Sequence, residues 1–252
     1  MRRILVTNDD GVHSEGIAAL AAALAHLGDV TVVAPTQEAS AIGHALTLAR
    51  PLRLETVRPR VFAVDGTPTD CVNVAVTHVL RQKPDLIVSG INKGWNVGDD
   101  VTYSGTVSGA LEGALLGVPS IAVSAERRRN EFDFGPAAKA AAIVAQAVLE
   151  RGLPKFTLLN LNVPFGVNHG FRVTVQAKRN HLTVVNERTD PRHRSYYWIE
   201  EGQNDWEPHD RSDYQAVRDG YISVTPLQPD MTAYDALSYV EGLELVTEEQ
   251  VR

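Results

Sequence analysis

Apolar and polar positions along the first two thirds of the chain predict strands and helices in turn. Short apolar runs rich in β-branched residues are typical of buried strands, and they occupy residues 4–7, 30–34, 52–57, 61–64, 86–88, 121–123 and 156–163. Apolar residues at helical spacing predict helices over residues 17–27, 72–80, 107–115 and 138–149. A strand, a helix and a second strand fit within the first 35 residues, which indicates a right-handed crossover in a parallel sheet. The expected fold class is therefore α/β, with helices packed on a mostly parallel sheet.

The pattern changes after about residue 165. Helical periodicity nearly vanishes from residue 171 to 226, where strands are predicted at 171–176, 196–199 and 221–227, and residues 233–246 form a weakly helical tail. We expect an α/β core over residues 1–165 and a β-rich extension over residues 166–252, within a single structural domain overall. A hairpin whose apolar strands have no helical cover is hard to stabilise alone. Packing of the extension against another subunit would supply the missing partner.

Composition narrows the class of protein. The 252 residues are 44% hydrophobic and 22% charged, which is typical of a globular chain. A net charge of −7 argues against a basic surface for a nucleic-acid duplex, so any phosphate must bind at a focused site. Cys71 is the only cysteine, which excludes an internal disulfide and favours a buried thiol. Because the sequence has no signal segment and no apolar run of roughly 18 residues, we expect a cytoplasmic protein without a membrane partner.

Polar residues follow the first predicted strand directly. Residues 8–11 are Asn-Asp-Asp-Gly, so Asp9 and Asp10 stand where a buried strand enters a turn. In open α/β sheets, ligands bind beyond the carboxyl ends of the strands. Two neighbouring carboxylates repel each other there unless a positive charge lies between them, and a hard divalent cation is the obvious candidate. The alternative is a turn in which both residues only satisfy the backbone geometry.

Three other loops or helix starts are expected at the same edge of the sheet. They carry Ser40, Asn92 and the run Ser104-Gly105-Thr106. With Asp9 and Asp10 they offer carboxylate, amide and hydroxyl oxygens, a set that suits Mg²⁺, Mn²⁺ or Ca²⁺ rather than zinc. Ser104 precedes a predicted helix, whose N–H groups and dipole attract anions, although Ser104 could be an N-cap only. A metal beside an anion-binding helix start is the usual apparatus for polarising a phosphate and activating a water.

Several common catalytic motifs are missing from the sequence. It has no Gly-x-x-x-x-Gly-Lys-Ser/Thr run, which argues against a P-loop nucleoside triphosphatase, and Tyr103-Ser104-Gly105 is not the nucleophile elbow of a serine hydrolase. Residues 8–12 superficially resemble the motif of aspartyl-phosphate phosphatases, but the nucleophile position holds Asn8, which cannot form an acyl phosphate. A metal-activated water is therefore favoured over a covalent intermediate.

A family resemblance is carried by several runs in the right order along most of the chain. They are Asn-Asp-Asp-Gly at 8–11, residues 34–40, Gly-Thr-Pro-Thr-Asp-Cys at 66–71, residues 89–100, Tyr-Ser-Gly-Thr-Val at 103–107, and residues 221–226. In these runs the sequence resembles the SurE (survival protein E) family of metal-dependent nucleotidases. The resemblance implies a Rossmann-like three-layer core and a C-terminal β-hairpin that is exchanged between subunits of a homodimer or homotetramer. It also implies hydrolysis of nucleoside 5′- and 3′-monophosphates, with short polyphosphate as a further candidate, and one divalent metal ion, Mg²⁺ or Mn²⁺.

The same resemblance implies roles for individual residues. The metal ligands would be Asp9, Asp10, Ser40 and Asn92. The phosphate would be held by Asn96, Ser104, Gly105 and Thr106. The candidate catalytic residues are Asp9, Asp10 and Ser104.

The loop after Ser40 departs from the family pattern. Residues 40–45 are Ser-Ala-Ile-Gly-His-Ala, where the family has Ser-Gly followed by small polar residues, so phosphate contacts from this loop are in doubt. Gly43 and His44 are candidate substrate-binding residues, and His44 could donate to phosphate or act as an acid. The alternative for His44 is a solvent-facing loop residue. Two other classes stay open for the whole protein, namely a non-catalytic, metal-dependent nucleotide sensor and a structural α/β domain.

Overall fold

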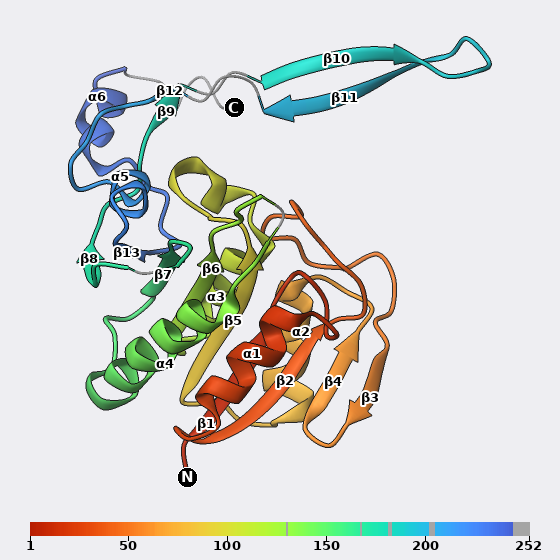
Figure 1. Cartoon of the computed structure of the whole chain (residues 1–252), viewed down its shortest axis with the longest axis vertical. Coiled ribbons are helices and arrows are strands. Elements are labelled where there is room, and N and C mark those ends of the chain that lie inside the picture. Colours follow the sequence, from red (N-terminus) through yellow and green to blue (C-terminus); the bar gives the residue numbers. More distant parts are fainter. Residues whose placement is uncertain (130, 167, 181–182, 202–204, 244–252) are drawn as a thin grey trace, which may run out of the picture.

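A nine-stranded sheet forms the centre of the computed structural model, with the strand order β3-β4-β2-β1-β5-β6-β7-β13-β8 (Figure 1). The structure describes residues 1–252 except 130, 167, 181–182, 202–204 and 244–252. All neighbours from β4 to β7 pair in parallel, whereas β3 and β13 run antiparallel to β4 and β7. The expected α/β class with a mostly parallel sheet is confirmed.

The strands of this sheet form where the apolar runs predicted them. Their bounds are β1 (Arg3–Thr7), β2 (Asp29–Pro35), β3 (Leu54–Arg58), β4 (Val61–Val64), β5 (Leu86–Lys93), β6 (Ser120–Ala125), β7 (Leu158–Val163), β8 (Phe171–Val173) and β13 (Ile222–Leu227). The central strands are apolar at nearly every position because both faces of the sheet are covered. In β1, Ile4 and Val6 pack on one face and Leu5 packs on the other.

Two layers of helices cover the sheet. The helices α1 (Glu15–Leu24) and α4 (Phe134–Arg151) pack together over one face. The other face is covered by α2 (Pro68–Val74), its π-helical continuation η1 (Ala75–Val79) and α3 (Gly105–Leu115). Cys71 of α2 is buried, as its apolar surroundings in the sequence predicted. None of the helices in the described ranges is long and apolar enough to cross a membrane.

The strand order reverses between β1 and β5. The chain runs outward from β1 through β2 to β4, and then returns to place β5 on the other side of β1. Crossovers that leave in opposite directions open a crevice at the carboxyl ends of these two strands, and this is where open α/β sheets bind ligands. Asp9 and Asp10 follow β1, and Asn92 lies near the end of β5. The topology alone therefore brings these three polar side chains to one crevice.

Two elements differ from the prediction. The strand β5 continues to Lys93, although residues 89–92 were expected in a loop, because Ser89 and Asn92 still pair with β6 across a shift in register. The helix α5 (Asp213–Arg218) lies where no helix was expected. Six residues are too few to show helical periodicity. The local feature that marks this helix is its N-cap, Ser212, whose side chain accepts from the N–H of Gln215.

The segment after residue 165 adds two strands to the main sheet and also forms a separate hairpin. The strands β13 and β8 extend the sheet beyond β7. The strands β10 (Thr183–Thr189) and β11 (Ser195–Glu201) form an antiparallel hairpin that projects away from the sheet (Figure 1). The short strands β9 (Arg179–Asn180) and β12 (Asp205–Trp206) pair with each other. In the tail, the 3₁₀ turn η3 (Tyr234–Ala236) leads into the short helix α6 (Leu237–Glu241). The last three residues of the helical tail predicted over 233–246 lie outside the described residues.

Candidate active site

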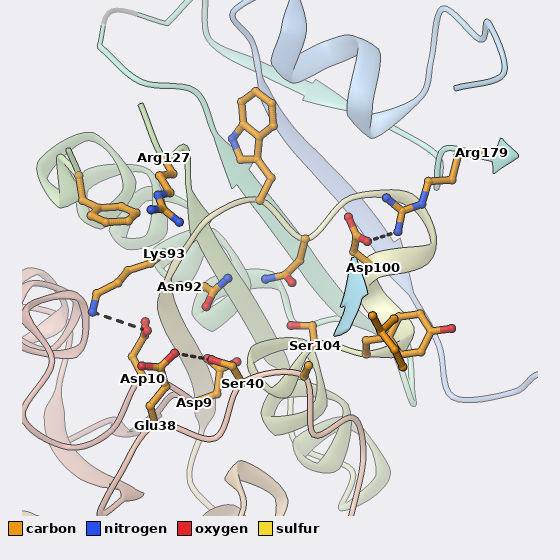
Figure 2. A pocket seen from close by; sticks show the side chains of 16 residues that line it. Asp9, Asp10, Glu38, Ser40, Asn92, Lys93, Asp100, Ser104, Arg127 and Arg179 are labelled. Atoms are coloured by element: carbon orange, nitrogen blue, oxygen red, sulfur yellow. Dashed lines mark hydrogen bonds and ion pairs between the residues drawn. The ribbon is translucent and has the colours of Figure 1, made fainter. Parts of the chain in front are cut away.

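A cavity of about 700 Å³ opens at the crevice between β1 and β5. It is large enough for a small-molecule ligand. In Figure 2 the side chains of Asp9, Asp10, Ser40 and Asn92 gather on one side of this cavity, with Ser104 next to them. Six of the residues predicted from the sequence line it: Asp9, Asp10, Ser40, Asn92, Asn96 and Ser104. Four separate stretches of the chain therefore meet here, as their positions after predicted strands suggested.

Asp9 is the more buried of the two carboxylates. Asp9 is 5% exposed, and one of its carboxylate oxygens accepts a hydrogen bond from the Thr106 hydroxyl at the start of α3. Its main-chain carbonyl accepts from the N–H of Ala39 at 2.8 Å, which ties the loop after β2 to the end of β1. Burial raises the pKa of the Asp9 carboxyl above its ordinary value, and the hydrogen bond from Thr106 opposes this rise.

Asp10 carries an unsatisfied oxygen. Its Oδ2 atom is buried and has no hydrogen-bond partner among the residues that the structure describes. Its Oδ1 atom lies 3.8 Å from the Lys93 ammonium. Burial and the negative charge of Asp9 raise the pKa of Asp10 to about 6. A buried carboxylate with an orphaned oxygen beside a second carboxylate is a costly arrangement unless a cation shares the site.

The neighbouring donors fit a hard divalent cation. The Asn92 Nδ2 atom donates to the Gly94 carbonyl at 2.9 Å, so the amide oxygen is the atom that would face a cation. The Ser40 hydroxyl donates to Glu38 at 2.6 Å, which leaves its oxygen lone pairs for a ligand. No group of three or more His, Cys, Asp or Glu side chains suited to a metal occurs in the described part of the chain. Two carboxylates with neutral oxygens are nevertheless an ordinary donor set for Mg²⁺ or Mn²⁺.

The start of α3 faces the same cavity. Ser104 is the N-cap of this helix, and its hydroxyl accepts from the N–H of Val107 at 3.1 Å. Helix starts attract anions through their N–H groups and the helix dipole. Gly105 permits a close approach, because a Cβ atom there would lie 2.8 Å from the Asp9 Cβ and 2.9 Å from its Oδ2. A phosphate at this helix start would therefore lie directly beside the carboxylate pair.

Asn96 is held in the cavity wall by a buried polar network. Its main-chain N–H donates to Asn162 at 2.8 Å, and its side-chain Nδ2 donates to Ser124 at 2.8 Å. Its carbonyl accepts from the side chains of both Asn160 and Asn162. The amide of Asn96 is therefore fixed before any ligand arrives.

Comparison with known proteins decides the family. The family model described as "Survival protein SurE" matches residues 4–183. The chain belongs to the SurE family. Proteins named 5′-nucleotidase SurE from Syntrophotalea carbinolica and Geobacter sulfurreducens are 54% and 50% identical to it, over 92% and 96% of this chain and 93% and 94% of their own. A solved SurE structure from Aquifex aeolicus is 44% identical and has a TM-score of 0.86, covering 96% of this chain and 99% of that one.

Some of the site residues predicted from the sequence do not line the cavity. Gly43 and His44 lie outside its wall; the Gly43 N–H donates to the Tyr103 carbonyl, and His44 contacts Glu112. Thr106 is fully buried, and its hydroxyl is engaged by Asp9. Its side chain thus orients a carboxylate in this structure.

Several charged residues of the cavity were not expected. Lys93 and Arg127 lie on one side of it, and Arg179 lies on the opposite side, paired with Asp100 (Figure 2). Lys93 could have been found from its place directly after Asn92. Arg179 gives no such signal, because it comes from the extension and reaches the cavity only through the fold.

Replacing Asp10 by asparagine is expected to stabilise the metal-free protein at neutral pH. Because the pKa of Asp10 is about 6 in the folded state, against an ordinary 3.8, the folded state holds its proton to higher pH than the unfolded chain. Stability therefore falls as the pH rises between these values, and an asparagine avoids this loss. Thermal unfolding in a chelator should show a gain for D10N that is larger at about pH 8 than at about pH 4.5. An equal gain at both values would contradict this assignment.

Proposed function

We propose that this chain is a divalent-metal-dependent phosphatase that hydrolyses nucleoside 5′-monophosphates to nucleoside and phosphate. The observation that carries the proposal is the buried Asp9–Asp10 pair, with its orphaned oxygen, beside the start of α3 in one cavity. A cation site and an anion site that share a wall suit a phosphate ester. The relatives named 5′-nucleotidase SurE match this chain over most of their length, and their name supports nucleoside 5′-monophosphates as the substrate class.

The residues that would hold the metal are Asp9, Asp10, Ser40 and Asn92. A bound Mg²⁺ or Mn²⁺ would polarise a phosphate oxygen and lower the pKa of a water molecule. Thr106 keeps the Asp9 carboxylate turned toward the cavity, and Lys93 offsets part of the charge on Asp10.

The remaining groups bind and orient the phosphate. The Ser104 hydroxyl and the N–H groups at the start of α3 face its non-bridging oxygens and stabilise the charge that develops there. Asn96 bounds the same space from the other side. A carboxylate of the pair would accept the proton of the attacking water.

A substrate panel tests this proposal. Purified protein is incubated with nucleoside 5′-monophosphates, nucleoside 3′-monophosphates and short polyphosphate, each with Mg²⁺ or Mn²⁺, and free phosphate is measured. We expect release from the 5′-monophosphates, with the 3′-monophosphates and polyphosphate as further candidate substrates. Metal-dependent binding of AMP without release of phosphate would indicate a nucleotide sensor and overturn the enzymatic assignment.

We also propose that the hairpin of β10 and β11 assembles the protein into a homodimer or homotetramer. Both faces of this two-stranded ribbon carry exposed apolar residues: Val184, Tyr196 and Trp198 on one face, and Val185, Tyr197 and Ile199 on the other. A lone hairpin is marginally stable in water, so a second copy of the chain is the natural cover.

The substitution Trp198→Glu is expected to shift the protein toward the monomer. The charge would be buried without a partner in a subunit interface, which disfavours association. Light scattering should show a lower mass for this variant, whereas Arg192→Ala at the exposed turn of the hairpin should keep the mass of the parent. An unchanged mass for Trp198→Glu would argue against assembly through this hairpin.

A further inference from the structure

The loop between β2 and β3 carries Ser40, and several contacts fix its path. The N–H of Ala39 donates to the Asp9 carbonyl at 2.8 Å, and the N–H of Gly43 donates to the Tyr103 carbonyl at 3.0 Å. The Thr67 hydroxyl donates to the Ala45 carbonyl at 2.7 Å. These bonds use main-chain atoms of the loop, so its sequence matters little to them.

His44 adds a contact that depends on a side chain. Its Nε2 atom lies 2.8 Å from Oε2 of Glu112 on α3. The other carboxylate oxygen of Glu112 accepts from the Asn73 amide on α2, also at 2.8 Å. The Glu112 residue is 8% exposed, whereas about a third of the His44 side chain reaches solvent. The loop is thus joined through a buried carboxylate to both helices on this face of the sheet.

The charge state of Glu112 agrees with this arrangement. Burial opposes its ionisation, yet the hydrogen bonds from His44 and Asn73 outweigh burial and hold the pKa of Glu112 below its ordinary value. An ionised, buried carboxylate keeps its partners because losing one leaves a charge uncompensated.

The helix that bears Glu112 is the helix whose first turn faces the cavity. Ser104, Gly105 and Thr106 lie about two turns before Glu112 on α3. Ser40 lies four residues before His44 in the loop. The contact therefore joins the segment that carries a candidate metal ligand to the helix that carries the candidate phosphate site.

We propose that His44 is a positioning residue, which through Glu112 fixes the spacing between Ser40 and the start of α3. This inference rests on the proposed function, because it assigns His44 the task of keeping a metal ligand, Ser40, at a fixed distance from the phosphate-binding start of α3. It gives His44 a role without contact to substrate. Loss of the contact lets the loop shift, so metal binding weakens while α3 itself stays folded.

Four variants and a control test this role. His44→Ala removes the contact, His44→Gln keeps an N–H donor at a similar reach, Glu112→Ala removes the acceptor, and the double variant His44→Ala with Glu112→Ala removes both. His26→Ala is the control, since His26 is exposed just after α1 and lies outside this loop. For each protein, Mn²⁺ binding is measured by calorimetry, AMP hydrolysis by kcat and KM, and folding by thermal unfolding.

We expect His44→Ala to weaken Mn²⁺ binding about 10-fold, in the range found for residues that orient metal ligands. His44→Gln should recover most of this loss, and the double variant should bind no worse than Glu112→Ala, because the two residues act as one unit. The Mn²⁺ affinity of His26→Ala should equal that of the parent.

Two results would overturn the role of His44. The first is parental Mn²⁺ affinity and kinetics in His44→Ala, with or without a lower melting temperature, since a purely structural residue would affect stability alone. The second is an additive loss in the double variant, since it would show that His44 does not act through Glu112. A parent protein that neither binds Mn²⁺ nor hydrolyses AMP is a distinct outcome, which would overturn the proposed function and this inference with it.

Discussion

Replacing Asp9 by asparagine is expected to lower kcat/KM for AMP by about 1000-fold, because a catalytic metal supplies several kcal/mol of transition-state stabilisation. Asp9 is the most enclosed donor of the candidate site and is already oriented by Thr106. An amide keeps the shape of the side chain but removes its charge, so the metal is held weakly while the fold persists. The measurement is phosphate release from AMP at several concentrations of Mn²⁺, together with calorimetric binding of Mn²⁺.

The control for this variant is Asp29→Asn. Asp29 begins β2 at the opposite end of the sheet, where it pairs with Arg60 near the surface. Exposed ion pairs contribute little to stability, so this protein should keep parental activity. Asp9→Asn with parental activity at equal Mn²⁺ would show that the carboxylate pair is not the metal site.

Replacing Gly105 by alanine is expected to lower kcat by about 100-fold or more, since small displacements of positioned groups have effects of this size. The new methyl group would lie 2.8 Å from the Asp9 Cβ, 2.9 Å from its Oδ2 and 3.2 Å from the Ala39 carbonyl oxygen. Two of these atoms belong to Asp9 and the third to the loop that carries Ser40, so helix α3 must retreat or Asp9 must turn away. Either movement separates the metal and phosphate groups.

The matched control for Gly105→Ala is Gly242→Ala. Gly242 follows α6, and a Cβ atom there would meet its nearest neighbour at 3.4 Å, an ordinary contact distance. Kinetics for AMP and thermal unfolding should be measured for both variants. A Gly105→Ala protein with parental kcat would mean that the approach of α3 to Asp9 is not needed for catalysis.

Much of the fold could be predicted from the sequence because its strands are covered on both faces. Runs such as residues 4–7 and 121–123 are apolar at successive positions, and this pattern is characteristic of central parallel strands. The carboxylate pair could be found for a related reason: Asp9 and Asp10 end such a run abruptly, and the carboxyl ends of parallel strands share an edge.

The remaining parts of the site depend on contacts that leave no local pattern. Arg179 reaches the cavity from β9, far along the chain from the core strands. The partner of His44 is Glu112, 68 residues away on α3. The spacing of apolar residues in this helix predicts which face is buried, but it does not indicate a contact with His44. The sequence pattern ended this strand at residue 88, because a glycine such as Gly90 is typical of loops. In the structure, β5 continues past Gly90 because residues beyond it still pair with β6.

The most direct test of the central claim is phosphate release from AMP with and without a divalent metal. The purified protein is treated with a chelator, the chelator is removed, and phosphate is measured before and after addition of Mn²⁺ or Mg²⁺. If Asp9 and Asp10 hold a catalytic cation, the metal-free protein releases no phosphate and added metal restores release, in the parent but not in Asp9→Asn. Equal release with and without metal would contradict the account.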